Sequence, residues 1–140
     1  MAQEGDCGQT AMKGGIKKIK IKSPSIGEIT AEITDENPQT VADFLKILPI
    51  SAEANLWGEE IYFKIPLKVR RENSRVVVKE GEIGIWVEDP SLCIFFGKTP
   101  VSQGGEIRAY SEVNVIGKII GDPEILKKVQ SREMIVVELL

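Results

Sequence analysis

The chain has 140 residues, of which 42% are hydrophobic and 28% charged, and it contains no histidine. This length suits a single globular domain, and a net charge of -3 argues against binding to nucleic acid or to an anionic membrane. Without an imidazole the chain lacks the commonest general base at neutral pH, and it cannot build a Ser-His-Asp or Cys-His nucleophile pair.

The chain begins with a small, polar segment, which predicts a disordered tail at 1–15 followed by one domain at 16–140. This segment has no apolar centre of the kind found in signal peptides, and no later run reaches the roughly 20 apolar residues of a membrane span. We therefore expect a cytoplasmic protein, with Met12 as an alternative start to Met1.

Two alternating strands are predicted next. The run IKKIKIK places Ile19 and Ile21 on one face and lysines on the other, which predicts a half-buried strand. We interpret the lysines as protection of an outer strand rather than as a binding patch. The turn SPSIG leads into GEITAEIT, whose alternation predicts a second strand and so a hairpin.

A helix is predicted to start at Asn37, with Pro38 in its first position, and to end before Pro49. A series of short β-branched or aromatic runs follows, namely EANLWG, EEIYFKIP, SRVVVKEG, EIGIWVED, SLCIFFG and EVNVIGKIIGD. Asp122 then caps a second proline-led helix, and REMIVVELL forms the last strand. About eight strands and about two α-helices predict a mainly β protein built as a closed eight-stranded β-barrel.

Metal and phosphate sites are not indicated. Cys7 and Cys93 lie far apart and lack zinc-ligand spacing, so we expect reduced thiols and neither a metal nor a cofactor. The acidic stretches DEN and EDP are the candidates for a hard-cation site of carboxylates, but we favour turn and cap roles for them. SQGG, at 102–105, lacks the lysine and the helix of a phosphate loop, which predicts a flexible tip.

Three motifs, in the same order and with matching spacing, resemble the cyclophilins. GEITAEITDENPQTVADFLKIL is similar to the opening strand and helix of that family, and GEIGIWVEDPSLCIFFG to its strand pair ending in S-Q-F-F. VNVIGKIIGDPEILKKVQS resembles the stretch that leads from an F-G-K-V strand into a helix. The resemblance runs from about Ile16 to Leu140 and implies the eight-stranded cyclophilin-like barrel. NLWGEEIYFKIP and CIFFGKTP further resemble a small cyclophilin-like family of bacteria and archaea whose role is not established.

The resemblance also implies where the isomerase groove of the cyclophilins falls. The F-H-R strand that carries their catalytic arginine is matched by YFKIP, with Ile65 at the arginine position. Phe63 and Ile65 share one face of this strand and Lys64 points away, so the lysine cannot replace the arginine. The groove positions supplied by the resemblance are Phe63, Ile65, Ile94, Phe96, Arg108 and Val113.

Alternation places Phe95 and Phe96 on opposite faces, and the resemblance puts Phe96 in the groove. The alternative is that both rings are core residues on the two sides of a covered strand. Polar side chains around NLWGEEIYFKIP are compatible with a small polar ligand or a weak acid-base role, although we favour a solvated face. These secondary candidates are Asn55, Trp57, Glu60, Tyr62 and Lys64. Trp57, Tyr62 and Trp86 could form an aromatic wall for a ligand, although half-buried packing is the commoner role of single aromatic residues in strands.

Together these observations predict a cyclophilin-like barrel that binds a peptide segment or small ligand in an apolar groove, without strong isomerase catalysis. We assign no catalytic residue, because Ile65 stands where the arginine is needed. Two alternatives are a weak peptidyl-prolyl isomerase and a non-catalytic oligomerising or scaffold module. We expect no nucleic-acid or membrane partner and leave a homo-oligomer open.

Overall fold

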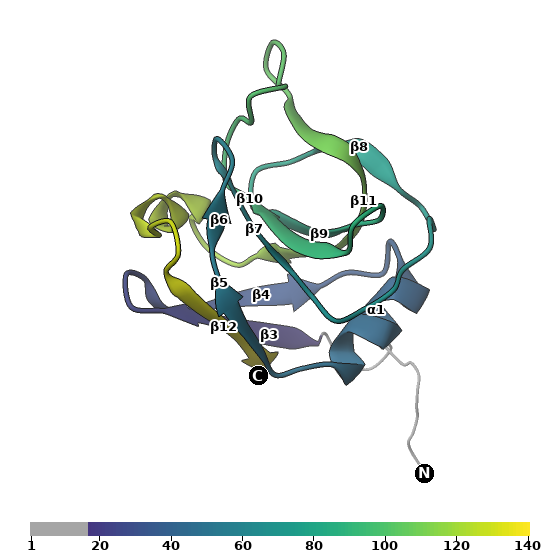
Figure 1. Ribbon diagram of the computed structural model, residues 1–140, viewed down its shortest axis with the longest axis horizontal. Helices are drawn as coiled ribbons and strands as arrows, with labels where there is room; N and C mark the ends of the chain where they lie inside the picture. Colours follow the sequence, from purple (N-terminus) through teal and green to yellow (C-terminus); the bar gives the residue numbers. More distant parts are fainter. Residues whose placement is uncertain (1–16) are drawn as a thin grey trace.

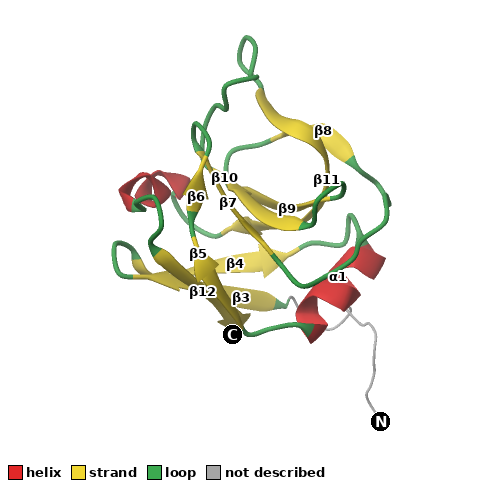
Figure 2. Cartoon of the chain, viewed as in Figure 1, coloured by secondary structure: helices red, strands yellow, loops and turns green. Residues whose placement is uncertain are grey.

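The computed structural model describes residues 17–140, in which one ten-stranded sheet curls on itself (Figure 1, Figure 2). The strands are β3 (Lys18–Ser23), β4 (Gly27–Ile33), β5 (Ile50–Glu53), β6 (Asn55–Leu56), β7 (Glu60–Lys64), β8 (Arg75–Val78), β9 (Glu82–Trp86), β10 (Ser91–Phe95), β11 (Ile107–Ile119) and β12 (Met134–Leu139). The helical segments are α1 (Pro38–Lys46) and η1 (Pro123–Lys128). The predicted tail at 1–15 lies outside the described residues, and no helix within them is long and apolar enough to cross a membrane.

The predicted mainly β class is confirmed, but the closed eight-stranded barrel is wrong. The strand order is β5-β12-β3-β4-β11-β9-β10-β7-β6, with β8 paired to β11, and hydrogen bonds do not close this sheet. Its two ends, β5 and β6, are consecutive in the chain and separated by Ala54 alone. The segment changes partner there, because β5 pairs with β12 and β6 with β7. The ends are therefore joined by the bending chain rather than by a ladder.

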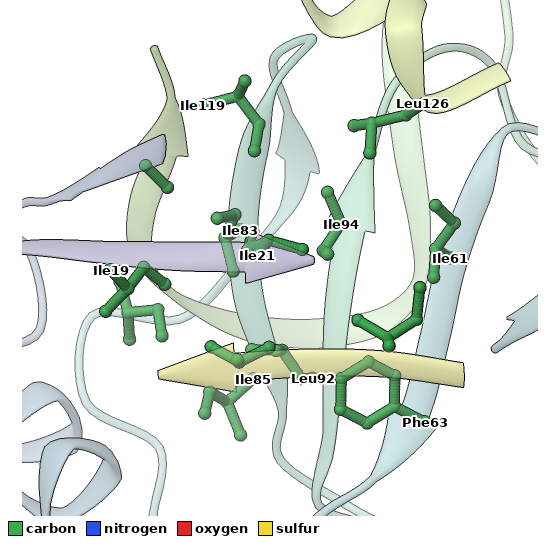
Figure 3. Close-up of a cluster of buried hydrophobic side chains, with 14 of the residues drawn as sticks. Ile19, Ile21, Ile61, Phe63, Ile83, Ile85, Leu92, Ile94, Ile119 and Leu126 are labelled. Carbon is green, nitrogen blue, oxygen red and sulfur yellow. The ribbon is translucent and has the colours of Figure 1, made fainter. Parts of the chain in front are cut away.

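The main core fills the inside of the curled sheet. Figure 3 shows side chains from several strands converging there, among them Ile19, Ile21, Phe63 and Ile94. The β3 residues confirm the predicted alternation, since Ile19 and Ile21 are buried and the lysines that alternate with them are not. Phe44 on α1 is fully buried in this core, which ties the helix to the sheet.

The helix α1 begins where the sequence predicts, with Asn37 at its N-cap and Pro38 in its first turn. Asn37 does not cap the helix with its side chain, which instead donates to the Val115 carbonyl at 2.8 Å. The free N–H groups of the first turn are satisfied by Glu72 from a distant loop, whose carboxylate accepts from the backbone of Gln39 and Thr40, each at 3.1 Å. A carboxylate at a helix N-terminus is favourable, so this contact holds the loop against the helix.

The second predicted α-helix is a 3₁₀-helix, η1. Asp122 caps it as predicted, because its Oδ1 accepts from the Glu124 backbone N–H at 3.0 Å. The segment is short, and the Val129 N–H returns to the Leu126 carbonyl at 3.1 Å before Val129 turns extended. The segment is too short for α-helical hydrogen bonding to extend along it, which favours the tighter 3₁₀ form.

A second apolar cluster covers the outer face of β9, β10 and β11. Its buried members are Val78, Cys93, Phe95, Ile107, Ala109, Val113 and Val115. The strand β10 is consequently buried on both faces, with Leu92 and Ile94 in the main core and Cys93 and Phe95 in this second cluster. The predicted opposite placement of Phe95 and Phe96 is confirmed, since Phe96 lies in the main core. Both rings are buried, which matches the alternative of a covered strand.

Candidate functional site

The groove positions implied by the resemblance fall into two separate regions. Phe63, Ile65, Ile94 and Phe96 come together in the main core, where each side chain is at most 7% exposed. Val113 belongs to the second cluster on the other face of the sheet. The fold thus brings four of the positions together and separates Val113 from them.

Arg108 is the remaining groove position, and it lies on β11, apart from the core residues. Its guanidinium pairs with Glu106 two residues earlier, with Nε 2.9 Å from the carboxylate. Lys64 is exposed and forms an ion pair with Asp89 at 3.0 Å. It points away from Phe63 and Ile65, as the alternation predicts.

A pocket of about 280 Å³ lies on the outer face of the sheet, where β7, β9, β10 and β11 adjoin. Four aromatic residues line it, namely Trp57, Tyr62, Trp86 and Tyr110, and its other lining residues are Glu60, Cys93, Ala109, Ser111 and Val113. It faces away from the main core, because Glu60 and Tyr62 alternate along β7 with Ile61 and Phe63, which are core residues.

The β6–β7 turn places Trp57 beside Glu60. Their backbones exchange two hydrogen bonds, Trp57 N–H to Glu60 O at 2.9 Å and Glu60 N–H to Trp57 O at 3.2 Å. Gly58 occupies the turn with a φ of +61°, and a Cβ there would lie 2.9 Å from the Lys98 carbonyl oxygen. Glycine is thus required both by the backbone conformation and by the close approach of the 98–100 loop.

Three aromatic rings meet at the mouth of the pocket. The Tyr110 ring stands edge-on to Trp57, with centroids 6.0 Å apart, and edge-on to Trp86, with centroids 5.8 Å apart. The Trp86 indole N–H donates to the Ser111 hydroxyl, which satisfies the polar edge of that ring. Edge-to-face pairs of this kind are favourable, so the rings hold one another in place although Tyr110 itself is 69% exposed.

Irregular pairing of β11 brings these residues to the pocket. The register of β11 against β8 shifts between Arg108 and Val113. Such a shift re-aims side chains, and here the consecutive residues Ala109, Tyr110 and Ser111 all line the pocket. A regular strand would have turned Tyr110 to the opposite face.

Glu60 is the only carboxylic acid in this lining, and the residue is 6% exposed. It forms no ion pair with any residue in the described range 17–140. Burial raises the pKa of Glu60 to about 7, an effect that a hydrogen bond with the Cys93 thiol partly offsets. Burial and the neighbouring Glu60 together raise the pKa of Cys93 well above its usual range. At neutral pH the carboxyl can therefore be present in either protonation state.

The pocket unites residues that the sequence treats separately. Trp57, Glu60 and Tyr62 are secondary candidates predicted from the sequence, and Trp86 belongs to the predicted aromatic wall. The fold places all four around one cavity. Asn55 stays outside it, exposed, and donates to the Tyr62 carbonyl at 3.2 Å. The sequence alone does not single out Cys93, Tyr110 or Ser111 as site residues, although all three line the pocket. The signal that points to Cys93 is its position in β10, where its register partner on β7 is Tyr62.

The pocket offers a buried acid and aromatic faces but no metal centre. Within residues 17–140, no three His, Cys, Asp or Glu side chains gather closely enough to hold a metal ion. The chemistry available is proton exchange at Glu60, charge pairing with a cation, and apolar or cation–π contact with the rings.

Comparison with known proteins identifies the family. A family profile described as Cyclophilin-like matches residues 17–138. The chain belongs to the cyclophilin-like family. Its fold is shared by the solution structure of a hypothetical protein from Archaeoglobus fulgidus, which is 40% identical, with a TM-score of 0.79 over 94% of this chain and 100% of that one. No curated protein matches. The resemblance deduced from the sequence is confirmed for this cyclophilin-like protein.

Proposed function

We propose that this cyclophilin-like protein binds a small ligand in the outer pocket, lined by Glu60 and the four aromatic residues. The observation that carries the proposal is the Glu60 carboxyl, which is buried in the pocket lining and has no ion-pair partner among the described residues. Burying an acid without a cationic partner costs free energy. Acids with strongly shifted pKa values in concave sites are typical of functional sites, which supports a binding role here.

The size of the cavity limits what it accepts. Its volume of about 280 Å³ lies at the lower end of the range for ligand pockets. One small molecule, or one side chain of a peptide segment, fits this volume. The aromatic lining would supply most of the contact area, and Glu60 would fix the orientation of the ligand.

Strong prolyl isomerase activity is not part of the proposal. An isomerase must bind the twisted amide better than the planar one, and a positioned hydrogen-bond donor supplies most of that difference. The residue at the matching position, Ile65, has no donor and packs in the main core beside Phe63. Lys64 forms an ion pair with Asp89 on the other side of the strand and faces neither Phe63 nor Ile65.

Tryptophan is a direct reporter for the proposal, because both tryptophans of the chain line the pocket. We would label the protein with 5-fluorotryptophan and screen a library of small fragments by ¹⁹F NMR. The proposal expects some fragments to shift both resonances in a saturable way. It is overturned if no fragment does so.

A pair of variants tests whether the shifts come from the pocket itself. Ala109→Leu adds a larger side chain to the pocket lining, whereas Ala42→Leu makes the same change on the exposed face of α1. We expect Ala109→Leu to weaken fragment binding and Ala42→Leu to leave it unchanged. If Ala109→Leu fails to fold, Glu60→Gln takes its place, because that change keeps the side-chain shape. Binding that is the same in every variant contradicts the proposal.

A further inference from the structure

We infer that the ligand of the outer pocket is an organic ammonium ion, held by the Glu60 carboxylate and by the faces of Trp57, Trp86 and Tyr110. This inference rests on the proposed function and adds the chemical class of the ligand. It concerns the charge of the ligand, which the proposed function leaves open.

The first argument is the charge of the pocket lining. Its nine residues include one carboxylic acid, Glu60, and neither a lysine nor an arginine. The ionised carboxyl is left without a counter-charge inside an aromatic wall, where the low dielectric strengthens any charge interaction. A ligand cation would supply the missing partner. An anionic ligand would instead meet a like charge with nothing nearby to neutralise it.

The second argument is the arrangement of the rings. Tyr110 lies between Trp57 and Trp86, nearly perpendicular to both, with interplanar angles of 78° and 82°. Aromatic faces attract a cation within about 6 Å of the ring centroid, and tryptophan does so most strongly. Since the Trp86 N–H is already bonded to Ser111, this ring presents apolar surface rather than a hydrogen-bond donor. Several rings next to one acid form the usual environment for an ammonium group.

The third argument is the protonation of Glu60. The other titratable groups that line the pocket with Glu60 are Cys93 from β10, Tyr62 from its own strand and Tyr110 from β11. Burial raises the pKa of Glu60 to about 7 and that of Cys93 well above its usual range, so Glu60 changes charge near neutral pH while the thiol stays neutral. A cation pairs with the ionised carboxyl and releases its proton on binding. Affinity should therefore rise as the pH rises through 7 and then level off.

A pair of matched probes tests the inference. Choline and 3,3-dimethylbutan-1-ol have the same shape but differ in charge, because a carbon replaces the quaternary nitrogen. Titrations followed by the two 5-fluorotryptophan resonances at pH 8 should show choline binding at least about tenfold more tightly than the alcohol. Between pH 7 and pH 6 the affinity for choline should fall by up to about tenfold, while that for the alcohol stays constant.

Variants separate the charge from the rings. Glu60→Gln should greatly reduce the preference for choline and leave only the contribution of the rings. The matched change Glu59→Gln, at a half-exposed carboxylate that pairs with Lys127, should keep the full preference. Tyr110→Leu should weaken choline about twofold to fivefold, with recovery in Tyr110→Phe. Butylammonium and N-acetyl-lysine N-methylamide distinguish a free amine from a lysine side chain as the source of the ammonium group.

The outcomes distinguish the inference from the proposed function. If neutral fragments shift the tryptophan resonances but choline, butylammonium and the lysine derivative do not, the pocket binds ligands and the ammonium inference is wrong. Equal binding of choline and the alcohol, or tighter choline binding at pH 6 than at pH 8, also overturns the inference. If nothing in the library or the probe set shifts either resonance, the proposed function fails as well.

Discussion

Glu60 and Cys93 lie on the outer face of β7 and β10, where both line the same pocket. Both residues are buried, at 6% and 3% exposure. Burial raises the pKa of each group, and the nearby Glu60 raises the pKa of Cys93 further. Burial sets the protonation behaviour of this acid, because it disfavours the ionised form of Glu60. The effect of Glu60 on the free energy of unfolding and the reactivity of the Cys93 thiol can both be measured without knowing any ligand.

The raised pKa of Glu60 predicts that this residue destabilises the fold above neutral pH. In the unfolded chain the carboxyl ionises at its ordinary pKa of 4.5, whereas in the fold the pKa is about 7. The protonated carboxyl therefore contributes fully to the free energy of unfolding below pH 4.5, and this contribution is lost as the pH rises from 4.5 to 7. The loss is about 3 kcal/mol. Glu60→Gln should therefore gain up to that amount relative to the parent between pH 4.5 and pH 8, as measured by denaturant unfolding.

A matched control for this measurement is Glu59→Gln, which alters the neighbouring half-exposed carboxylate that pairs with Lys127. Its stability relative to the parent should change little over the same pH range, since surface ion pairs contribute at most about 1 kcal/mol. An unfolding free energy for Glu60→Gln that tracks the parent at every pH would show that Glu60 ionises normally in the fold.

The Cys93 thiol should react slowly with alkylating reagents. Burial and the nearby Glu60 raise its pKa, so the reactive thiolate is scarce at pH 8. In a Cys7→Ser background, where Cys93 is the remaining cysteine, iodoacetamide should label the folded protein at least about tenfold more slowly than the unfolded chain. Adding Glu60→Gln should accelerate labelling, because the negative neighbour is removed. Labelling of the folded parent as fast as the unfolded chain would contradict the placement of Cys93.

Phe44→Ala should cost about 3 to 5 kcal/mol of unfolding free energy, because the ring is fully buried between α1 and the sheet. The matched surface change, Lys46→Ala on the same helix, should cost less than about 0.5 kcal/mol. Denaturant unfolding measures both. A loss below about 1 kcal/mol for Phe44→Ala would mean that another face of the helix packs on the core.

Prolyl isomerisation of a standard proline-containing peptide should be at least about a hundredfold slower than with an arginine-bearing cyclophilin. The reason is the absence of a donor at Ile65, which is 7% exposed and packed in the core. A protease-coupled or NMR exchange assay under identical conditions measures the two rates. Activity equal to the reference, retained in Ile65→Ala and lost in Lys64→Ala, would show that Lys64 acts in place of the arginine.

Local patterns in the sequence determined which side chains share a face. The alternation of Ile19 and Ile21 with lysines is reproduced in β3. That of Phe63 and Ile65 with Lys64 is reproduced at the end of β7 and the residue after it. The start of α1 followed from Asn37 and the proline after it. These features depend on neighbours a few residues apart, and steric preferences of the backbone act over the same distance.

Only the tertiary structure decided how the sheet ends and where the pocket forms. The change of partner at Ala54 depends on β12 and β7, which lie far from each other in the sequence. Trp57 comes from the β6–β7 turn, and Glu60, Trp86 and Tyr110 come from three different strands. The irregular register of β11 turns Tyr110 toward the pocket. Strand pairing and bulges are set by long-range hydrogen bonds and packing. The periodicity of a single segment carries no information about these.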